Sequence, residues 1–563
     1  MKRCPECRRD YYDDSLLYCL EDGAALVAGV PDEPVTAILS DGRTSSEAAT
    51  RTFDDDPTTG TSAEGRTSRT ASTRNSVIAG VVGVVLITAL GLGGYLYYGR
   101  GSSKQIDSIA VMPFVNESGN PDLDYLSDGM TDTLISRLSK LPNLSVKARS
   151  SVFRYKGHEM SAPTIGRELN VQAVLNGRVV QHGEQLTLTL ELVDVRTENL
   201  IWSEKYDRRA SDLVSLQNEV AHDVSSKLQT RLSGTDKEKL GKTYTTDPEA
   251  YEAYLKGRFY WNKRTKDGIG KSIEFFQQAV DKDPNYALGY VGLADSYAVL
   301  QIYTGHGSSE SLTKAKSAAD HALQIDDSLA EAHASLGNID QQLWLWDEAD
   351  REFRRSIELD PKYPTARHWY SISLKVKRRF DDSLREIKVA QELDPLSSLM
   401  GHNVGVAYLL KGDFASAEQQ FRKVNELDPA FPLAHQYLGW THIKQGRIEE
   451  GTAEIQKAVQ LSGNSSRAEA ELGYCYAIGG RRNDALQMIS KLDAKYKAKE
   501  ATAVSMSIIY AGLGDKDQAF AWLEKAFEDR NGELSDITWR PVFDTLRDDR
   551  RYIDLVRRMK LDI

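Results

Sequence analysis

The stretch AEAHASLGNIDQQLWLWDEADREFRRSIELDP, residues 330–361, decides the fold of the C-terminal half of this 563-residue chain. Its closing Asp-Pro returns at a regular distance: Asp360, Asp394 and Asp428 are each followed by proline and lie 34 residues apart. Asp326 stands one period earlier. Proline lacks a backbone donor and restricts the residue before it, so it ends a helix. The spacing predicts a helical hairpin repeated every 34 residues.

Small side chains return in the same register, where two helices would approach too closely for a larger group. In the first helix of each hairpin they are Gly337, Ser371, Gly405, Gly439, Gly473 and Ser507. Larger fillers such as Phe353, Phe421 and Ile455 occupy the seam between the two helices. These positions resemble tetratricopeptide (TPR) repeats. The resemblance implies about eight units and an all-α TPR superhelix over residues 248–530.

A TPR superhelix has a concave face lined by the first helix of each hairpin. The resemblance places on this face His368, Ile372, Lys375, His402, Val406, Gln436, Trp440 and Tyr474. The stripe is mostly apolar, so we expect it to bind an apolar or aromatic segment of a protein or peptide partner. Alternatively, Trp440 and Tyr474 pack between repeats. Residues 531–563 predict a final amphipathic helix as a C-terminal cap.

Residues 105–235 predict an α/β domain. Short apolar runs and alternating patterns indicate strands over residues 109–114, 144–148, 173–180, 185–194 and 200–206. Amphipathic or turn-bounded segments indicate helices over residues 125–141, 164–169 and 213–232. Gly183 marks a hairpin between two of the strands. Because helices alternate with strands from both halves of this segment, the domain belongs to the α/β class.

Three phrases within this segment carry a family resemblance: IAVMPFVNESGNPDLDYLSDGMTDTLISRLSKL, VKARSSVFRYKG and IGRELNVQAVLNGRVVQHGEQLTLTLELVD. They resemble the TolB amino-terminal-domain-like module. In that family the module commonly follows one membrane helix and precedes TPR repeats in bacterial single-pass membrane proteins. The resemblance implies no catalytic residue.

Residues 1–28 contain a cysteine pattern typical of a small zinc site. Cys4 and Cys7 flank two residues, and Cys19 is followed two residues later by Asp22. Zinc binds four thiolate, imidazole or carboxylate donors in a tetrahedron, so Cys4, Cys7, Cys19 and Asp22 form the predicted ligand set of a structural zinc. The segment resembles the zinc-ribbon-like knuckles that open many bacterial membrane proteins. In the alternative interpretation, the aspartate marks a knuckle that has lost its metal.

Residues 77–98, VIAGVVGVVLITALGLGGYLYY, carry no charge and are long enough to predict one transmembrane helix. A buried soluble helix is the alternative. Residues 29–76 are rich in Thr, Ser, Asp and Arg and predict a disordered linker. Arginines before the helix and reduced thiolates favour a cytoplasmic N-terminus and extracytoplasmic C-terminal domains at the cell membrane. Small residues such as Ala79 and Gly83 could let two such helices pack as a homodimer.

Composition and missing motifs narrow the function. The formal net charge of −11 and a pI near 5.6 argue against nucleic acid as a partner. The sequence contains no GxxxxGK[ST], HExxH, GxSxG or strand-borne GxGxxG, so no enzyme is expected. We therefore expect a membrane-anchored TPR scaffold that binds a protein or peptide through its concave face. The alternative is a transmembrane signalling receptor whose cytoplasmic zinc knuckle recruits an output partner.

Overall fold

The computed structural model describes residues 2–3, 10–11, 27–28, 106–141, 143–158, 160–228, 240–304 and 309–561. The chain forms two compact units, Met1–Arg100 and Gly101–Ile563. In the first unit, β1 (Lys2–Arg3) pairs antiparallel with both β2 (Asp10–Tyr11) and β3 (Val27–Ala28). The predicted linker over residues 29–76 and the predicted helix over residues 77–98 lie outside the described residues.

The predicted location in a membrane requires correction. Among the residues that the structure describes, no helix combines the length and apolar character needed to cross a bilayer. The longest of these helices is α9 (Ala287–Thr304), with 18 residues, and it packs against neighbouring repeat helices. We therefore withdraw the prediction of a single-pass membrane protein with a cytoplasmic N-terminus and extracytoplasmic C-terminal domains.

The second unit begins with a mixed α/β domain, as predicted. Its strands are β4 (Ser108–Val111), β5 (Val115–Asn116), β6 (Ser145–Val146), β7 (Ala173–His182), β8 (Gln185–Asp194) and β9 (Leu200–Arg209). Its α-helices are α2 (Asp124–Ser139), α3 (Arg149–Phe153), α4 (Ala162–Leu169) and α5 (Leu213–Lys227). Two 3-10 turns, η1 (Pro121–Leu123) and η2 (Ala210–Asp212), precede α2 and α5. Gly183 has a positive φ in the β7–β8 hairpin, as predicted.

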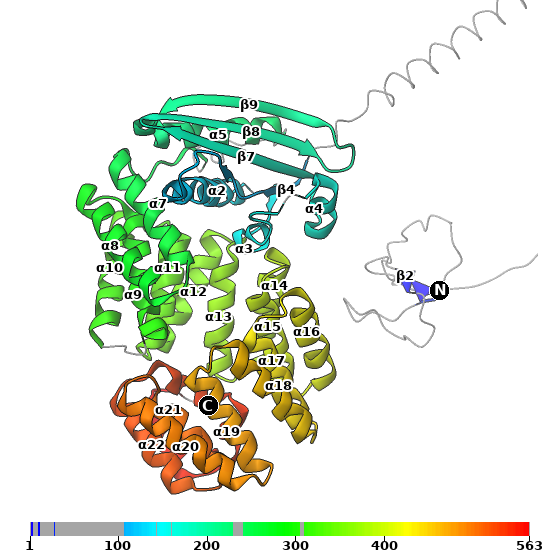
Figure 1. The fold of residues 1–563 in the computed structure, drawn as a ribbon, viewed down its shortest axis with the longest axis vertical. Helices are drawn as coiled ribbons and strands as arrows, with labels where there is room; N and C mark the ends of the chain where they lie inside the picture. Colours follow the sequence, from blue (N-terminus) through cyan, green and yellow to red (C-terminus); the bar gives the residue numbers. More distant parts are fainter. Residues whose placement is uncertain are drawn as a thin grey trace, which may run out of the picture. The chain divides into compact units, whose positions relative to one another are not determined.

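The sheet has the order β6-β4-β7-β8-β9, with β5 also on β7. Strand β4 is parallel to β6 and β7, whereas β7, β8 and β9 form an antiparallel meander. Alternate residues of β8 face the core: Leu186, Leu188, Leu190 and Leu192 have no exposed surface. Figure 1 shows α2 between this sheet and the helical part of the unit.

Eight helical hairpins follow in the described part of residues 240–561, which confirms the predicted TPR superhelix. The first helices are α7 (Pro248–Asn262), α9, α11 (Ala330–Gln342), α13 (Pro364–Val376), α15 (Ser398–Leu410), α17 (Pro432–Lys444), α19 (Ser466–Ile478) and α21 (Ala503–Gly512). Their partners are α8 (Lys266–Lys282), α10 (Ser309–Ile325), α12 (Trp346–Leu359), α14 (Phe380–Leu393), α16 (Phe414–Leu427), α18 (Ile448–Leu461), α20 (Arg482–Lys497) and α22 (Lys516–Glu528). From α11 to α19 the first helices begin every 34 residues. Asp360, Asp394 and Asp428 each terminate a second helix, as the Asp-Pro spacing predicted.

The glycines of the repeat lie where two helices nearly touch. A Cβ added to Gly405 would lie 2.5 Å from the ring of Phe421, and one added to Gly337 would lie 2.9 Å from Phe353. At Gly439 the obstacle is the backbone oxygen of Gly451, at 2.6 Å. The structure therefore confirms that a small residue in the first helix faces a large side chain of the second. This pairing sets how closely the two helices of a hairpin pack.

The C-terminal segment differs from the single amphipathic helix that we predicted. It contains two 3-10 turns, η3 (Gly532–Thr538) and η4 (Pro541–Leu546), and one short helix, α23 (Arg550–Arg558). Pro541 begins a new turn because it cannot donate to the preceding one. Phe543, Leu546 and Met559 are fully buried, so this segment belongs to the core of the array.

This segment also connects distant repeats. The Trp346 indole Nε1 donates to the carbonyl oxygen of Met559 at 2.9 Å, and Thr538 Oγ1 donates to that of Val376 at 2.8 Å. The rings of Trp344 and Phe527 stack with centroids 5.3 Å apart. The third hairpin therefore contacts the last one directly, and the C-terminal segment contacts both the third and the fourth hairpin.

We expect Gly405→Ala to destabilise the array by about 1–3 kcal/mol, because its methyl group would overlap the Phe421 ring. Gly270→Ala in α8 is the matched control. No atom lies within 4 Å of an added Cβ there, so that substitution should stabilise the helix by about 0.5–1 kcal/mol. Urea unfolding followed by circular dichroism measures both. Equal effects of the two substitutions would contradict the close packing at Gly405.

Candidate functional site: the cavity between the α/β domain and the repeats

The α/β domain docks on the loops that connect successive hairpins. Asp394 accepts hydrogen bonds from Ser150 and from Ser151, the latter at 2.6 Å. Lys242, between α5 and the first hairpin, forms a 2.6 Å ion pair with Asp326. The aspartates of the 34-residue period thus have a second role that the sequence did not reveal: they bind groups that precede the array.

Helix α2 brings the domain into direct contact with the first hairpin. A Cβ at Gly129 would lie 2.8 Å from Leu255 of α7, so the glycine allows the two helices to approach closely. Beside this contact, the Tyr251 hydroxyl lies 3.1 Å from Thr133 Oγ1 and donates to Gln217 of α5. One hydrophobic core runs from the sheet into the first hairpin. The domain and the array therefore form one body.

A cavity of about 1190 Å³ lies between α2, the N-terminal end of α3 and the inner side of the array. Its walls include α7, α9, α11 and α13, and the turn η3 closes its far side. Binding pockets for small molecules typically have volumes of about 300–1000 Å³. The cavity is large enough for a short peptide segment or a sizeable small molecule.

Charged and aromatic side chains meet in this cavity near α2 and α7. The carboxylate of Asp132 lies 3.7 Å from Arg149 Nε and 3.4 Å from Arg258 Nη2. Both distances exceed the usual length of a charge-assisted hydrogen bond, about 2.7–2.9 Å. The Arg149 guanidinium lies over the Phe153 ring at 3.6 Å, and the Arg258 guanidinium is 5.0 Å from the centre of the Trp261 ring. These aromatic contacts fix both guanidinium groups beside the cavity.

Burial alters the proton affinity of these groups. Burial lowers the pKa of Arg149, although the nearby Asp132 carboxylate acts in the opposite direction. Asp295 of α9 also lines the cavity, and burial raises the pKa of its carboxyl group despite a hydrogen bond from Ser335. Burial also acts to lower the pKa of Arg258, but Asp132, Tyr254 and Asp295 together raise it above its ordinary value.

Only two of the predicted partner-binding residues line this cavity. They are His368 and Ile372, both on α13. The other six, Lys375, His402, Val406, Gln436, Trp440 and Tyr474, are at most 6% exposed. Trp440 donates from Nε1 to Glu471 at 2.6 Å, and its ring centroid lies 5.3 Å from that of Tyr474. The structure therefore places this part of the concave face in contact with the chain itself, and its role in binding a partner stays a prediction.

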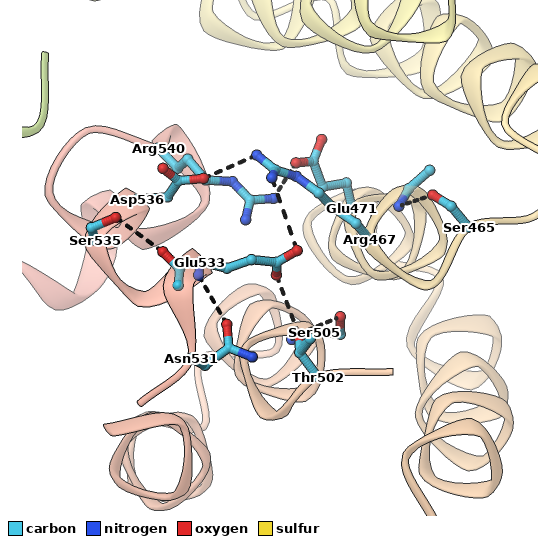
Figure 2. A network of polar contacts seen from close by, with 12 residues as sticks. Ser465, Arg467, Glu471, Thr502, Ser505, Asn531, Glu533, Ser535, Asp536 and Arg540 are labelled. Carbon is cyan, nitrogen blue, oxygen red and sulfur yellow. Dashed lines mark hydrogen bonds and ion pairs between the residues drawn. The ribbon is translucent and has the colours of Figure 1, made fainter. Parts of the chain in front are cut away.

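Figure 2 shows the polar network that holds the C-terminal segment against this part of the concave face. Arg540 donates to Glu471 of α19, and both side chains are only 1% exposed. Arg467, on the same helix, donates to Asp536 at 3.1 Å. Glu533 accepts from Thr502 at 3.2 Å. An ion pair this deeply buried is sensitive to the loss of either partner, because the remaining charge cannot be solvated.

Lys375 and two histidines lie buried beside this network. The Lys375 Nζ sits 4.0 Å from the centre of the Trp539 ring and 3.5 Å from Asn403 Oδ1. Burial lowers the pKa of Lys375 to about 8, although Asp536 favours its charged form. Burial and Lys375 together lower the pKa of His368 to about 3, so this imidazole is neutral at pH 7. The pKa of His402 is lowered well below its usual value for the same reasons.

The predicted zinc ligands Cys4, Cys7, Cys19 and Asp22 lie outside the described residues. Within the described part of the chain, no group of three or more His, Cys, Asp or Glu side chains is placed to hold a metal ion. Cys475 is a buried thiol on α19, and burial raises its pKa.

Comparisons with known proteins fit this architecture. The family described as "Tetratricopeptide repeat" matches residues 402–431. The chain contains tetratricopeptide repeats. The family described as "HilA/YgeH-like transcriptional regulator, second domain" matches residues 104–223, which comprise most of the α/β domain. The predicted resemblance of this domain to the TolB module stays a prediction.

A curated relative of this TPR protein is named "Putative adenylate cyclase 3" from Rhizobium meliloti (strain 1021). It is 30% identical over 230 residues, which are 41% of this chain and 39% of that protein. The chain therefore spans well under half of the relative's length.

Two solved structures of TPR-type or related proteins match parts of the chain. YrrB, described as "a TPR protein with an unusual peptide-binding site", is 21% identical with a TM-score of 0.26, covering 34% of this chain and 93% of its own. PilF of Pseudomonas aeruginosa is 23% identical with a TM-score of 0.30, covering 37% and 94% respectively.

We expect Lys375→Met to stabilise the protein at pH 7. The folded-state pKa of about 8 lies below the ordinary value of 10.5, so the unfolded chain holds this proton more tightly. The resulting penalty is complete below pH 8 and disappears as the pH rises towards 10.5. The gain of the variant in urea midpoint should therefore be larger at pH 7 than at pH 10. A gain that is constant with pH would show that Lys375 is not held in a destabilised charged state.

Proposed function

We propose that this protein is a TPR scaffold that binds a peptide segment of a partner inside the cavity between its α/β domain and its repeats. The supporting observation is the cavity itself. Its volume of about 1190 Å³ and its mixture of aromatic and charged walls suit a ligand larger than a metabolite. The TPR repeats support a function in binding another chain, because such arrays present concave surfaces for that purpose.

We favour the cavity as the partner-binding site over the predicted stripe around Trp440, because the two surfaces differ in how accessible they are. Trp440 is 2% exposed and lies among buried residues that include the C-terminal segment. The cavity walls instead retain accessible side chains: Arg149 and Arg258 are partly exposed, at 24% each, and Ser136 is exposed. A partner can therefore contact the cavity walls without unfolding part of the core.

We propose binding rather than catalysis for this chain. The cyclase activity in the name of the curated relative is not carried over, because the match covers only 39% of that protein. The transmembrane receptor that we considered from the sequence is not proposed, since the prediction of a membrane location has been withdrawn.

We further propose a structural zinc in the N-terminal unit. The strand register pairs Arg3 with Asp10 and also with Val27, so Cys4 and Cys7 belong to the segment that joins two paired strands. Two cysteines separated by two residues are typical of zinc ribbons. The bound metal would tie this small sheet together.

Metal analysis of the purified full chain tests the zinc proposal. We expect about one zinc per chain, and none after the double substitution Cys4→Ser with Cys7→Ser. Cys475→Ser is the matched control and should retain the metal, because Cys475 lies in α19 of the other unit. Equal zinc content in all three proteins would contradict the assignment of Cys4 and Cys7 as zinc ligands.

Ser136→Trp tests the cavity as the partner site. Ser136 lies on α2, is exposed and lines the cavity, so an indole there would occupy the space without displacing core atoms. Ser203→Trp is the matched control, since Ser203 is exposed on β9 and lies outside the cavity. In peptide-display selections on the immobilised full chain, we expect Ser136→Trp to lose at least about tenfold in affinity for the selected peptides. Peptides that bind both variants equally would place the site elsewhere.

A further inference from the structure

We propose that the cavity recognises an acidic peptide, whose carboxylate binds between Arg149 and Arg258 in the place that Asp132 now partly fills. This inference rests on the proposed function and names the chemistry of its ligand. It is carried by the arrangement of one carboxylate between two guanidinium groups that line the cavity.

Asp132 is too far from both arginines to satisfy them. A guanidinium group presents five donors, and a carboxylate that binds it well forms two parallel bonds of about 2.8 Å. Here Arg258 Nη2 lies 3.4 Å and Arg149 Nε lies 3.7 Å from Asp132. Neither contact is a full charge-assisted hydrogen bond, so both groups keep donor capacity for a second carboxylate.

Three other cations that line the cavity have closer polar partners. Lys362 donates to the carbonyl oxygens of Leu141 and Leu144 at 2.8 and 3.0 Å. Arg467 donates to Asp536 at 3.1 Å. Arg137 donates to Asn218 and, at 3.1 Å, to the carbonyl oxygen of Leu240. Arg149 and Arg258 therefore differ from these three cations in the length of their polar contacts.

The two guanidinium groups are also held in place before a ligand arrives. Phe153 supports Arg149, and Trp261 supports Arg258. Fixed donors lose little conformational entropy on binding, and the planar guanidinium group matches a carboxylate better than a lysine would. Tyr254 also lines the cavity and can pack against apolar parts of the same peptide.

Asp132 makes the proposal testable because it competes with the ligand. Asp132→Asn removes the competing charge while preserving shape, so it should raise affinity for an acidic peptide by about tenfold. Arg149→Gln and Arg258→Gln should each lower it by about 10- to 100-fold. A purely structural role for the three residues would weaken binding in every variant.

The experiment uses the full chain and a displayed library of random hexapeptides, followed by calorimetry with the selected synthetic peptides. We expect the wild-type protein to enrich Asp or Glu at one position, and the Gln isostere of that peptide to bind at least about tenfold more weakly. Arg351→Gln is the matched control, because Arg351 is an exposed arginine on α12 that does not line the cavity. Thermal melts confirm that each variant is folded.

The outcomes separate the two proposals. Failure of the wild-type protein to enrich any peptide relative to Ser136→Trp would overturn the proposed function. Enrichment of peptides without an acidic position, or unchanged binding in Asp132→Asn and Arg258→Gln, would overturn only the acidic preference. Displacement of the selected peptide by inorganic phosphate at far lower concentration than by acetate would show that a phosphate group, and not a carboxylate, is the ligand.

Discussion

The close approach of paired helices at the glycines of the repeat is the constraint on which this structure depends. Gly405 and Gly337 leave room for Phe421 and Phe353, so each hairpin packs at a fixed distance. Repetition of one hairpin geometry produces a curved array with a concave inner surface. That surface contains the large first-helix side chains, and it must be covered by other parts of the chain or by a ligand.

This protein covers most of that surface with its own residues. The C-terminal segment fills the region near Trp440, held by the buried pair of Arg540 and Glu471. The α/β domain covers the opposite end and contacts the loops at Asp326 and Asp394. The cavity lies between the C-terminal segment and the α/β domain. A buried ion pair contributes little net stability, because desolvation of both charges offsets their attraction.

The charges of the cavity follow from the same arrangement. Arg149 and Asp132 come from the α/β domain, whereas Arg258 comes from the first hairpin. They meet where α2 and α7 approach closely at Gly129. A site assembled from two domains has donors that neither domain satisfies alone, which explains why Arg149 and Arg258 share one carboxylate at long distance. Binding of a partner would then also stabilise the contact between the domains.

The sequence by itself determined the repeats and the α/β domain, because both depend on local period. The 34-residue spacing of Asp394 and Asp428, and the alternation around Leu188 and Leu190, are visible without knowledge of the fold. Only the tertiary structure decided what the concave face contacts. The pairing of Arg540 with Glu471, and of Arg258 with Asp132, joins residues 69 and 126 positions apart. Such contacts follow from the curvature of the whole array, and no local pattern encodes them.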